Sequence, residues 1–221
     1  MVSIPSGSES FDKLTGGLNP LKTYLLNGNR ESGKEELAYR LSAANLKEGR
    51  AVVYITVNKG SSELLNDFLA HGLNISQHLG QSFKIIDDFS RTISPESSDN
   101  QYTKVVNGPV DLTGLSVAMS SMNNDFVKDG KSVINVLDSL STLLLYNNTI
   151  TMFRFLQFVC GRAKTSGVTS LFLLNSDMHA NDVTESIKSL MDGVINVKLE
   201  DGKRFFTISG SAKEVLSWSP L

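Results

Sequence analysis

The stretch that decides the fold is Gly28-Asn29-Arg30-Glu31-Ser32-Gly33-Lys34-Glu35. It follows the pattern G-x-x-x-x-G-K-[ST], in which backbone N–H groups hold nucleotide phosphates, the Lys reaches the β- and γ-phosphates, and the final hydroxyl binds Mg²⁺. Gly28, Gly33 and Lys34 match this pattern, but Glu35 stands where the hydroxyl belongs. The motif therefore predicts a phosphate-binding loop and leaves open whether that loop still binds a nucleotide.

The residues on either side of the motif supply the strand and the helix that such a loop requires. Before it, residues 23–27 form a short, apolar, β-prone run. After it, Leu37, Leu41 and Ala44 recur at helical spacing, and residues 51–57 are typical of a strand buried on both faces. A glycine turn that joins strand to helix and binds nothing is the alternative interpretation.

Composition bounds the class of protein. The chain has 221 residues, of which 40% are hydrophobic and 20% charged, so we expect a single domain over residues 1–221 with a sizeable core. A formal net charge of −2 gives no general attraction to nucleic acid or anionic membranes. No apolar stretch reaches the about 18 residues that a membrane span needs, and the single cysteine, Cys160, excludes an intramolecular disulfide. We expect a soluble, cytoplasmic protein.

Strand-like and helix-like runs alternate along the rest of the chain, which predicts an α/β fold with a mostly parallel central sheet covered by helices on both faces. Further strands are expected at 83–86, 132–137 and 168–174, and helices at 62–71, about 111–128, 149–165 and 182–190. Residues 193–199 and 205–208 flank an Asp201-Gly202 pair, which predicts a C-terminal β-hairpin. Residues 90–108, rich in Ser, Asn, Asp and Pro, are expected to form a mobile loop.

A second candidate site residue is Asp138, which ends the apolar run of residues 133–137. An Asp at the end of such a strand binds Mg²⁺ in phosphate-loop NTPases. Because the carboxyl ends of parallel strands meet at one edge of the sheet, Asp138 and the loop can converge there. The alternative is that Asp138 only caps the next turn with Ser139. Asn135, a polar residue inside this strand, is unusual.

Three separated segments carry a resemblance to a known family: residues 10–20 (S-F-D-K-L-T-G-G-L-N-P), 138–143 (D-S-L-S-T-L) and 190–195 (L-M-D-G-V-I). Together with the loop, their order resembles the KaiC-like branch of the RecA-fold ATPases, and the resemblance covers nearly the whole chain. It implies a three-layer RecA-like phosphate-loop NTPase fold. It also implies an ancestral capacity to bind ATP with Mg²⁺ at a subunit interface.

The chain departs from this family at three chemical positions. Glu35 replaces the Mg²⁺-binding Thr or Ser. Asn58 and Lys59 stand where the family has two glutamates that polarise the attacking water, so the general base is missing. Residues 208–213 lack the family's Lys-x-Arg pair, which reaches a neighbouring subunit's γ-phosphate, and leave only Lys213. These departures argue against catalysis.

The charge of Glu35 also opposes binding. A carboxylate about 4 Å from phosphate oxygens costs roughly 4 kcal/mol at an effective dielectric constant of about 20, which corresponds to roughly a thousandfold in affinity. The cost disappears if Glu35 ligates Mg²⁺ directly or turns toward water. A further possibility is that the carboxylate of Glu31 occupies the phosphate position from within the loop.

Three functions are consistent with these observations. The favoured one is a pseudo-ATPase, a regulatory or scaffold module that acts through a protein partner or self-assembly and binds ATP weakly or not at all. The first alternative is a slow Mg²⁺-dependent ATPase with Glu35 as a metal ligand and Asp87, Asp88 or Asp177 as base. The second is a recombinase-like DNA accessory protein, but residues 145–148 and 175–179, where such proteins bind DNA, contain no Lys or Arg.

Overall fold

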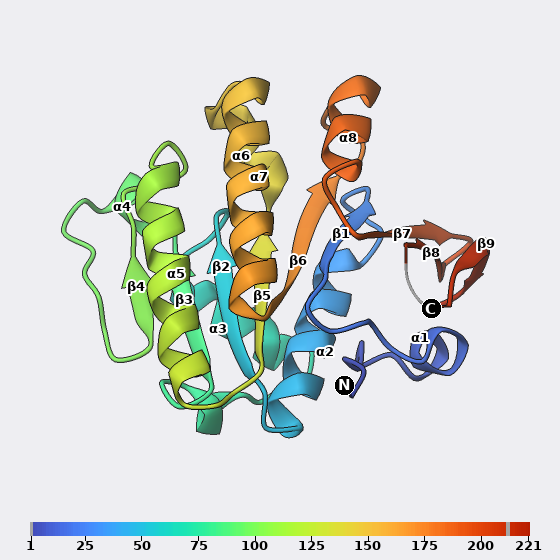
Figure 1. Ribbon diagram of the computed structural model, residues 1–221, viewed down its shortest axis with the longest axis horizontal. Helices are drawn as coiled ribbons and strands as arrows, with labels where there is room; N and C mark the ends of the chain where they lie inside the picture. The colour runs from blue at the N-terminus through green and yellow to red at the C-terminus, as the bar shows by residue number, and fades with distance from the viewer. Residues whose placement is uncertain (1, 211–212) are drawn as a thin grey trace.

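The computed structural model describes residues 2–210 and 213–221, and in these residues one nine-stranded sheet forms the centre of the molecule (Figure 1). Its strands are β1 (Thr23–Gly28), β2 (Ala51–Thr56), β3 (Phe83–Asp87), β4 (Thr103–Val105), β5 (Val133–Asp138), β6 (Val168–Asn175), β7 (Gly193–Glu200), β8 (Lys203–Ser209) and β9 (Val215–Pro220). The strand order is β4-β3-β2-β5-β6-β1-β7-β8-β9. The strands from β4 to β7 in this order are parallel, and β8 and β9 add antiparallel pairs.

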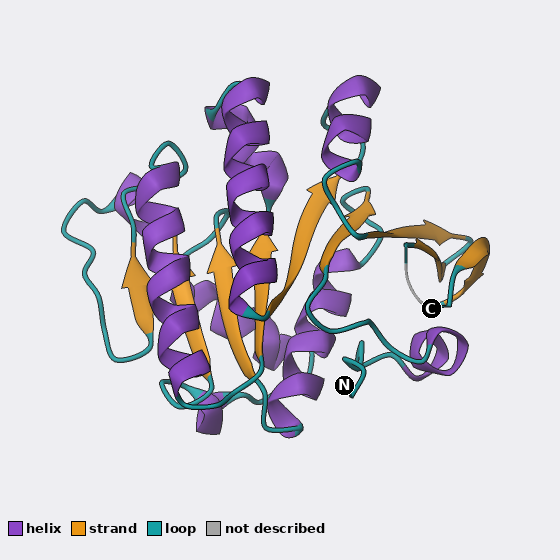
Figure 2. Cartoon of the chain, viewed as in Figure 1, coloured by secondary structure: helices purple, strands orange, loops and turns teal. Residues whose placement is uncertain are grey.

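Helices cover both faces of the sheet, which makes three layers (Figure 2). They are α1 (Glu9–Thr15), α2 (Lys34–Lys47), α3 (Ser61–Ala70), α4 (Ser90–Ile93), α5 (Leu112–Lys128), α6 (Leu140–Tyr146), α7 (Thr149–Ser166) and α8 (Asn181–Lys188), with a 3-10 turn at Ser76–His78. One buried cluster joins the sheet to α2 and α3, and the other joins it to α5, α6 and α7. The predicted α/β fold, with a mostly parallel sheet and a C-terminal hairpin, is confirmed.

The two-sided burial explains why the central strands are continuous apolar runs. In β2, Val52 and Tyr54 point into the cluster under α2 and α3, whereas Val53 and Ile55 point into the cluster under α5 and α7. Alternate side chains face opposite sides of a sheet, so a strand covered on both faces needs apolar residues at every position. Asn135 breaks this rule in β5.

The prediction of one continuous loop over residues 90–108 is only partly correct, because two short elements interrupt it. This segment contains the single-turn helix α4 and the strand β4, which pairs with β3 at the edge of the sheet. The predicted hairpin is correct in detail, because Asp201 (φ 50°) and Gly202 (φ 72°) both have the positive φ angles of a type I′ turn. In the described part of the chain, no helix has the length and apolar character needed to cross a membrane.

One partly buried contact ties the first strand to its surroundings. The Oδ2 atom of Asp192, just before β7, accepts hydrogen bonds from the backbone N–H and the hydroxyl of Thr23, each at 2.9 Å. Its Oδ1 atom lies 2.9 Å from Nζ of Lys164 in α7. Partial burial acts to raise the pKa of Asp192, but Lys164 and Thr23 hold it below its ordinary value. Asp192 therefore fixes the start of the strand that leads into the phosphate-binding loop.

Candidate nucleotide-binding site

The loop between β1 and α2 has the compact shape that its two glycines predict. A Cβ atom on Gly28 would lie 2.5 Å from Oγ of Ser32 and 2.6 Å from the backbone oxygen of Val197, so only glycine fits there. Gly33 has a φ angle of 78° and is the N-cap of α2. A Cβ on Gly33 would lie 2.3 Å from Nε of Arg204, so the guanidinium group lies directly against the loop. Strand, loop and helix N-terminus are therefore arranged as in a phosphate-binding site.

The cation of the loop is directed inward. Lys34 is 0% exposed, and its Nζ donates to the backbone oxygen of Asn29 at 3.0 Å and lies 2.8 Å from Oε1 of Glu35. The hydroxyl of Ser32 donates to the same Asn29 oxygen at 2.8 Å. Glu31 is exposed, so it is Glu35, not Glu31, that neutralises the loop from within. Arg30 is exposed as well.

The structure brings Asp138 close to Glu35 at the carboxyl edge of the sheet. Asp138 is 3% exposed, and burial together with the charge of Glu35 raises its pKa to about 6, against the opposite influence of Lys59 and Lys34. The hydroxyl of Tyr54 donates to Oδ2 of Asp138 at 3.3 Å. Glu35 and Asp138, the two positions expected to hold Mg²⁺, thus lie near enough to repel each other.

The turn-capping alternative does not describe the side chain of Asp138. Ser139 is the N-cap of α6 and makes no side-chain capping bond, while the carboxylate of Asp138 is turned to Tyr54. The orientation of Asp138 is therefore set by the buried tyrosine, not by the turn that follows.

Asn58 and Lys59, which the resemblance places at the position of the general base, are held by neighbouring side chains and offer no carboxylate. Nδ2 of Asn58 donates to Oγ of Ser139 at 3.4 Å, and its Oδ1 accepts from the hydroxyl of Thr142. Nζ of Lys59 lies 2.6 Å from Oδ2 of Asp67. Burial acts to lower the pKa of Lys59, but Asp67 raises it, so Lys59 remains a cation. Lys59 thus brings an ammonium group, paired with Asp67, to the place where a carboxylate is expected as general base.

The three other acids considered as a base are no better placed. Asp87 accepts hydrogen bonds from the backbone N–H groups of Ser61, Phe89 and Ser90 and so serves as a cap. Asp88 is 1% exposed, its carboxyl oxygens make no hydrogen bond of ordinary geometry, and burial with nearby acids raises its pKa to about 8, so it is protonated at neutral pH. Asp177 is exposed in the segment between β6 and α8.

Sequence reasoning missed two residues at this edge of the sheet. Asn175 ends β6, directly beside Gly28 of β1, and its buried Oδ1 has no hydrogen bond. Arg204 comes from β8, and its Nη1 lies 2.6 Å from Oε2 of Glu36 in the first turn of α2. The position of Asn175 after an apolar strand could have suggested it, because strand ends meet here. Nothing in the local sequence indicates that Arg204 contacts the loop.

The glycines give the loop its compact turn at the N-terminus of α2, but its lysine already has a partner. The ammonium group of Lys34 is already paired, and Glu35 adds a carboxylate beside Asp138. Within the described residues, no group of three or more His, Cys, Asp or Glu side chains could hold a metal ion. A nucleotide with Mg²⁺ would have to displace Glu35 from Lys34 before it could bind as it does on a standard loop.

Comparison with known proteins supports the fold and identifies the family. A solved structure, the KaiC-like protein PH0186 of Pyrococcus horikoshii, superposes with a TM-score of 0.73 over 98% of this chain and 92% of its own, at 17% sequence identity. A protein named UPF0273 protein MK0039, from Methanopyrus kandleri, is 23% identical over 204 residues, which cover 90% of this chain and 77% of that protein. The profile of the family described as "ATPase: KaiC" matches residues 4–209, and the chain therefore belongs to the KaiC ATPase family.

Proposed function

We propose that this KaiC-family domain is a pseudo-ATPase, a regulatory or scaffold module that binds ATP weakly or not at all and acts through a protein partner or self-assembly. The family implies ATP and Mg²⁺ as ligands. The observation that carries the proposal is the ion pair inside the loop, in which Nζ of the fully buried Lys34 lies 2.8 Å from Glu35.

The ion pair opposes binding in two ways. A phosphate group reaches Lys34 only after the pair with Glu35 is broken, which takes the counter-charge away from a fully buried ammonium group. The released carboxylate then faces the phosphate oxygens, at a cost of roughly 4 kcal/mol at about 4 Å and an effective dielectric constant of about 20. The loss of the base at Asn58 and Lys59 adds a separate obstacle to hydrolysis.

Titration calorimetry with ATP, with and without Mg²⁺, tests the proposal. We expect no binding tighter than about 1 mM in the wild-type chain and a gain of up to roughly a thousandfold in Glu35→Thr, which removes the charge and restores the hydroxyl. Lys34→Ala is the control, because any binding through the loop has to disappear in it. Micromolar binding by the wild type that depends on Lys34 would contradict the proposal, as would turnover above about 0.01 per second lost in the same variant.

A second candidate, a slow Mg²⁺-dependent ATPase, is favoured by the proximity of Glu35 and Asp138. Carboxylate oxygens are ligands that Mg²⁺ prefers, and a cation between the two acids would relieve the repulsion that raises the pKa of Asp138. In that case ATP binding requires Mg²⁺ and falls in Glu35→Gln. The pseudo-ATPase predicts the reverse, since Glu35→Gln removes a repelling charge.

A further inference from the structure

The phosphate-binding edge of the sheet does not explain why Asn135, a polar residue, lies in the middle of β5. Asn135 is 1% exposed, lies between Val133 and Leu137, which both face α5 and α7, and therefore faces those helices itself. Its Oδ1 atom has no hydrogen bond, and neither has Oδ1 of Asn123 in α5, which is 8% exposed. A buried amide oxygen without a hydrogen bond costs stability, so two of them beside one pocket call for an explanation.

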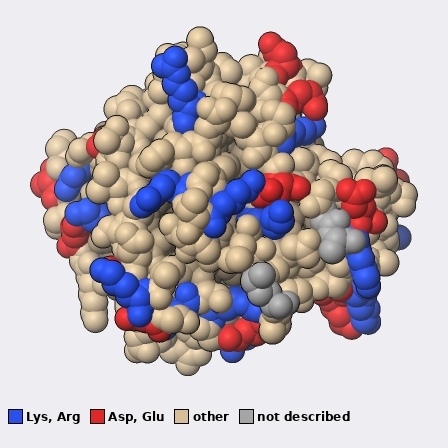
Figure 3. All heavy atoms as spheres, in the orientation of Figure 1, with Lys and Arg blue, Asp and Glu red and all other residues tan. Residues whose placement is uncertain are grey.

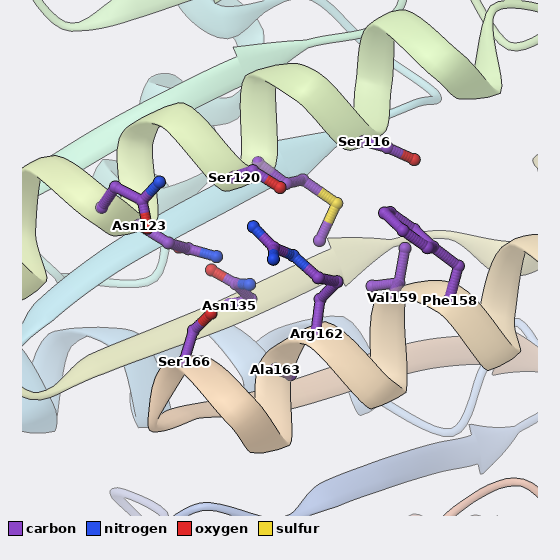
Figure 4. A pocket seen from close by; sticks show the side chains of 11 residues that line it. Ser116, Ser120, Asn123, Asn135, Phe158, Val159, Arg162, Ala163 and Ser166 are labelled. Carbon is purple, nitrogen blue, oxygen red and sulfur yellow. The ribbon is translucent and has the colours of Figure 1, made fainter.

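Both amides line a small polar pocket between α5 and α7 (Figure 4). Its other polar lining residues include Ser116, Ser120 and Arg162, whose guanidinium group reaches from α7 across Asn135. The pocket has a volume of about 20 Å³, which is room for about one water-sized group. Arg162 is the one charged residue in this lining, and no ion pair or side-chain hydrogen bond neutralises it among the residues that the structure describes.

An apolar groove continues from the polar pocket along the same two helices. It has a volume of about 420 Å³ and shares Ser116 and Phe158 with the pocket. Val117 and Phe158 line it and are 64% and 54% exposed, although both are large apolar side chains. Arg154 is its one charged lining residue. A polar pocket that opens into an exposed apolar groove has the composition of a peptide-binding surface.

The charged side chains that line the polar pocket and the apolar groove, Arg162 and Arg154, are both cationic. Figure 3 shows Lys and Arg side chains spread over the face formed by α5 and α7, with acidic side chains mostly toward its margins. Lys164 on α7 is paired with Asp192, but in the described ranges Arg154 and Arg162 have no acidic partner. The chain as a whole has a net charge of −2, so the excess of cations in the groove is a local feature. Charge complementarity therefore selects an acidic partner.

We propose that the polar pocket and the apolar groove between α5 and α7 together bind one segment of a partner protein. This segment presents an acidic side chain to Arg162 in the pocket and apolar side chains to Val117 and Phe158 in the groove. The guanidinium group binds a carboxylate through paired N–H donors, and the amide groups of Asn135 and Asn123 can rotate to present their NH₂ groups. A free small carboxylate would leave the apolar groove exposed, which is why the occupant is a polypeptide. The proposal does not depend on the state of the phosphate-binding loop.

The test is a selection of displayed random 12-residue peptides on the full chain, followed by affinity measurements with labelled synthetic peptides. We expect the selected peptides to carry Asp or Glu three or four residues from an apolar residue. Their affinity should fall at least tenfold in Arg162→Glu and in Phe158→Ala. Lys47→Glu, an equal charge reversal on α2 at the opposite face of the sheet, is the matched control and should leave affinity unchanged.

A charge swap makes the test specific. A peptide in which Lys replaces the acidic residue should bind Arg162→Glu better than the wild type. Peptides enriched for Asn or Gln instead of acids, equal binding to wild type and Arg162→Glu, or no binding peptide at all would overturn the proposal. So would sedimentation data in which the wild type self-associates and Arg162→Glu does not, because the occupant would then be a second copy of the chain. None of these measurements involves a nucleotide, so their outcome is independent of the ATP titration.

Discussion

At the scale of single residues, the pKa of Asp138 depends on the charge of Glu35. Burial and Glu35 raise the pKa of Asp138 to about 6. In Glu35→Gln the burial and the two nearby ammonium groups remain, so we expect the pKa of Asp138 to fall. Carboxyl ¹³C NMR titrations of the wild type and the variant measure this change. Glu31→Gln, at an exposed loop residue, serves as the control and should leave the titration of Asp138 where it is.

The raised pKa of Asp88 predicts that the stability of the fold depends on pH. Its pKa of about 8 in the folded chain exceeds the value of about 3.9 in the unfolded chain, so the protonated form stabilises the fold at low pH. That stability is lost as pH rises from about 4 through about 8, by at most about 1.4 kcal/mol per pH unit. Asp88→Asn cannot ionise, and we expect it to be more stable than the wild type at pH 8 and closer to it at pH 5.

Urea unfolding at both pH values measures the difference between Asp88→Asn and the wild type. An advantage of the same size at pH 5 and pH 8 would mean that Asp88 does not titrate in this range. Asp177→Asn, at an exposed position, gives the background effect of the same substitution.

At the scale of elements, Asp192 joins three of them: β1 through Thr23, α7 through Lys164, and β7, which it precedes. Asp192→Ala removes the acceptor of two hydrogen bonds at the start of β1, and we expect a loss of about 1–3 kcal/mol in unfolding free energy. Lys164→Ala should cost less, because the side chain of Lys164 is 49% exposed. Equal losses of unfolding free energy in the two variants would mean that the ion pair, and not the two hydrogen bonds to Thr23, provides the stabilisation.

The contribution of Asp192 to the stability of the fold is also expected to depend on pH. Its pKa lies below the ordinary value in the folded chain, so its contribution is present above the unfolded pKa of about 3.9 and is lost as pH falls through the folded value. We expect the stability difference between wild type and Asp192→Ala to shrink on acidification from pH 6 to pH 3, which urea unfolding at the two values would show.

The sequence predicts those elements whose pattern is long or chemically marked. Residues 51–57 were recognisable because β2 is buried on both faces, and the hairpin because Asp201 and Gly202 adopt positive φ angles. The elements β4, β9, α1, α4 and α6 were not predicted. The strand β4 has three residues and depends on pairing with β3, and α1, α4 and α6 are too short for a periodic pattern. The strand β9 lies at the edge of the sheet and is mostly exposed, so its sequence is not a continuous apolar run. The sequence was enough to place residues 28–35 and Asp138 at one edge of the sheet, because each follows the end of a predicted strand. The Lys34–Glu35 pair and the contact of Arg204 could not, since they depend on side-chain packing across the fold.

At the scale of the whole molecule, charge argues against nucleic acid as a partner. The net charge is −2, and residues 145–148 and 175–179 contain no cation other than a histidine. We expect no binding of a thymidine 30-mer at about 150 mM salt in a fluorescence anisotropy titration, because single-strand binding needs a basic groove. An affinity that falls steeply as salt rises would contradict this, since counterion release is the signature of contacts to phosphates.

The ion pair between Lys34 and Glu35 also affects how far a ligand could change the conformation of this domain. A loop that folds around a ligand has two states, and a ligand shifts their balance only through different affinities for them. Here the ammonium group of Lys34 already has a counter-charge from the chain itself, in Glu35. Hydrogen exchange of residues 29–34 should then be equally slow with and without ATP. On the proposed function, hydrolysis does not time the output of this domain, which then depends on the amount of protein and on the partner that binds it.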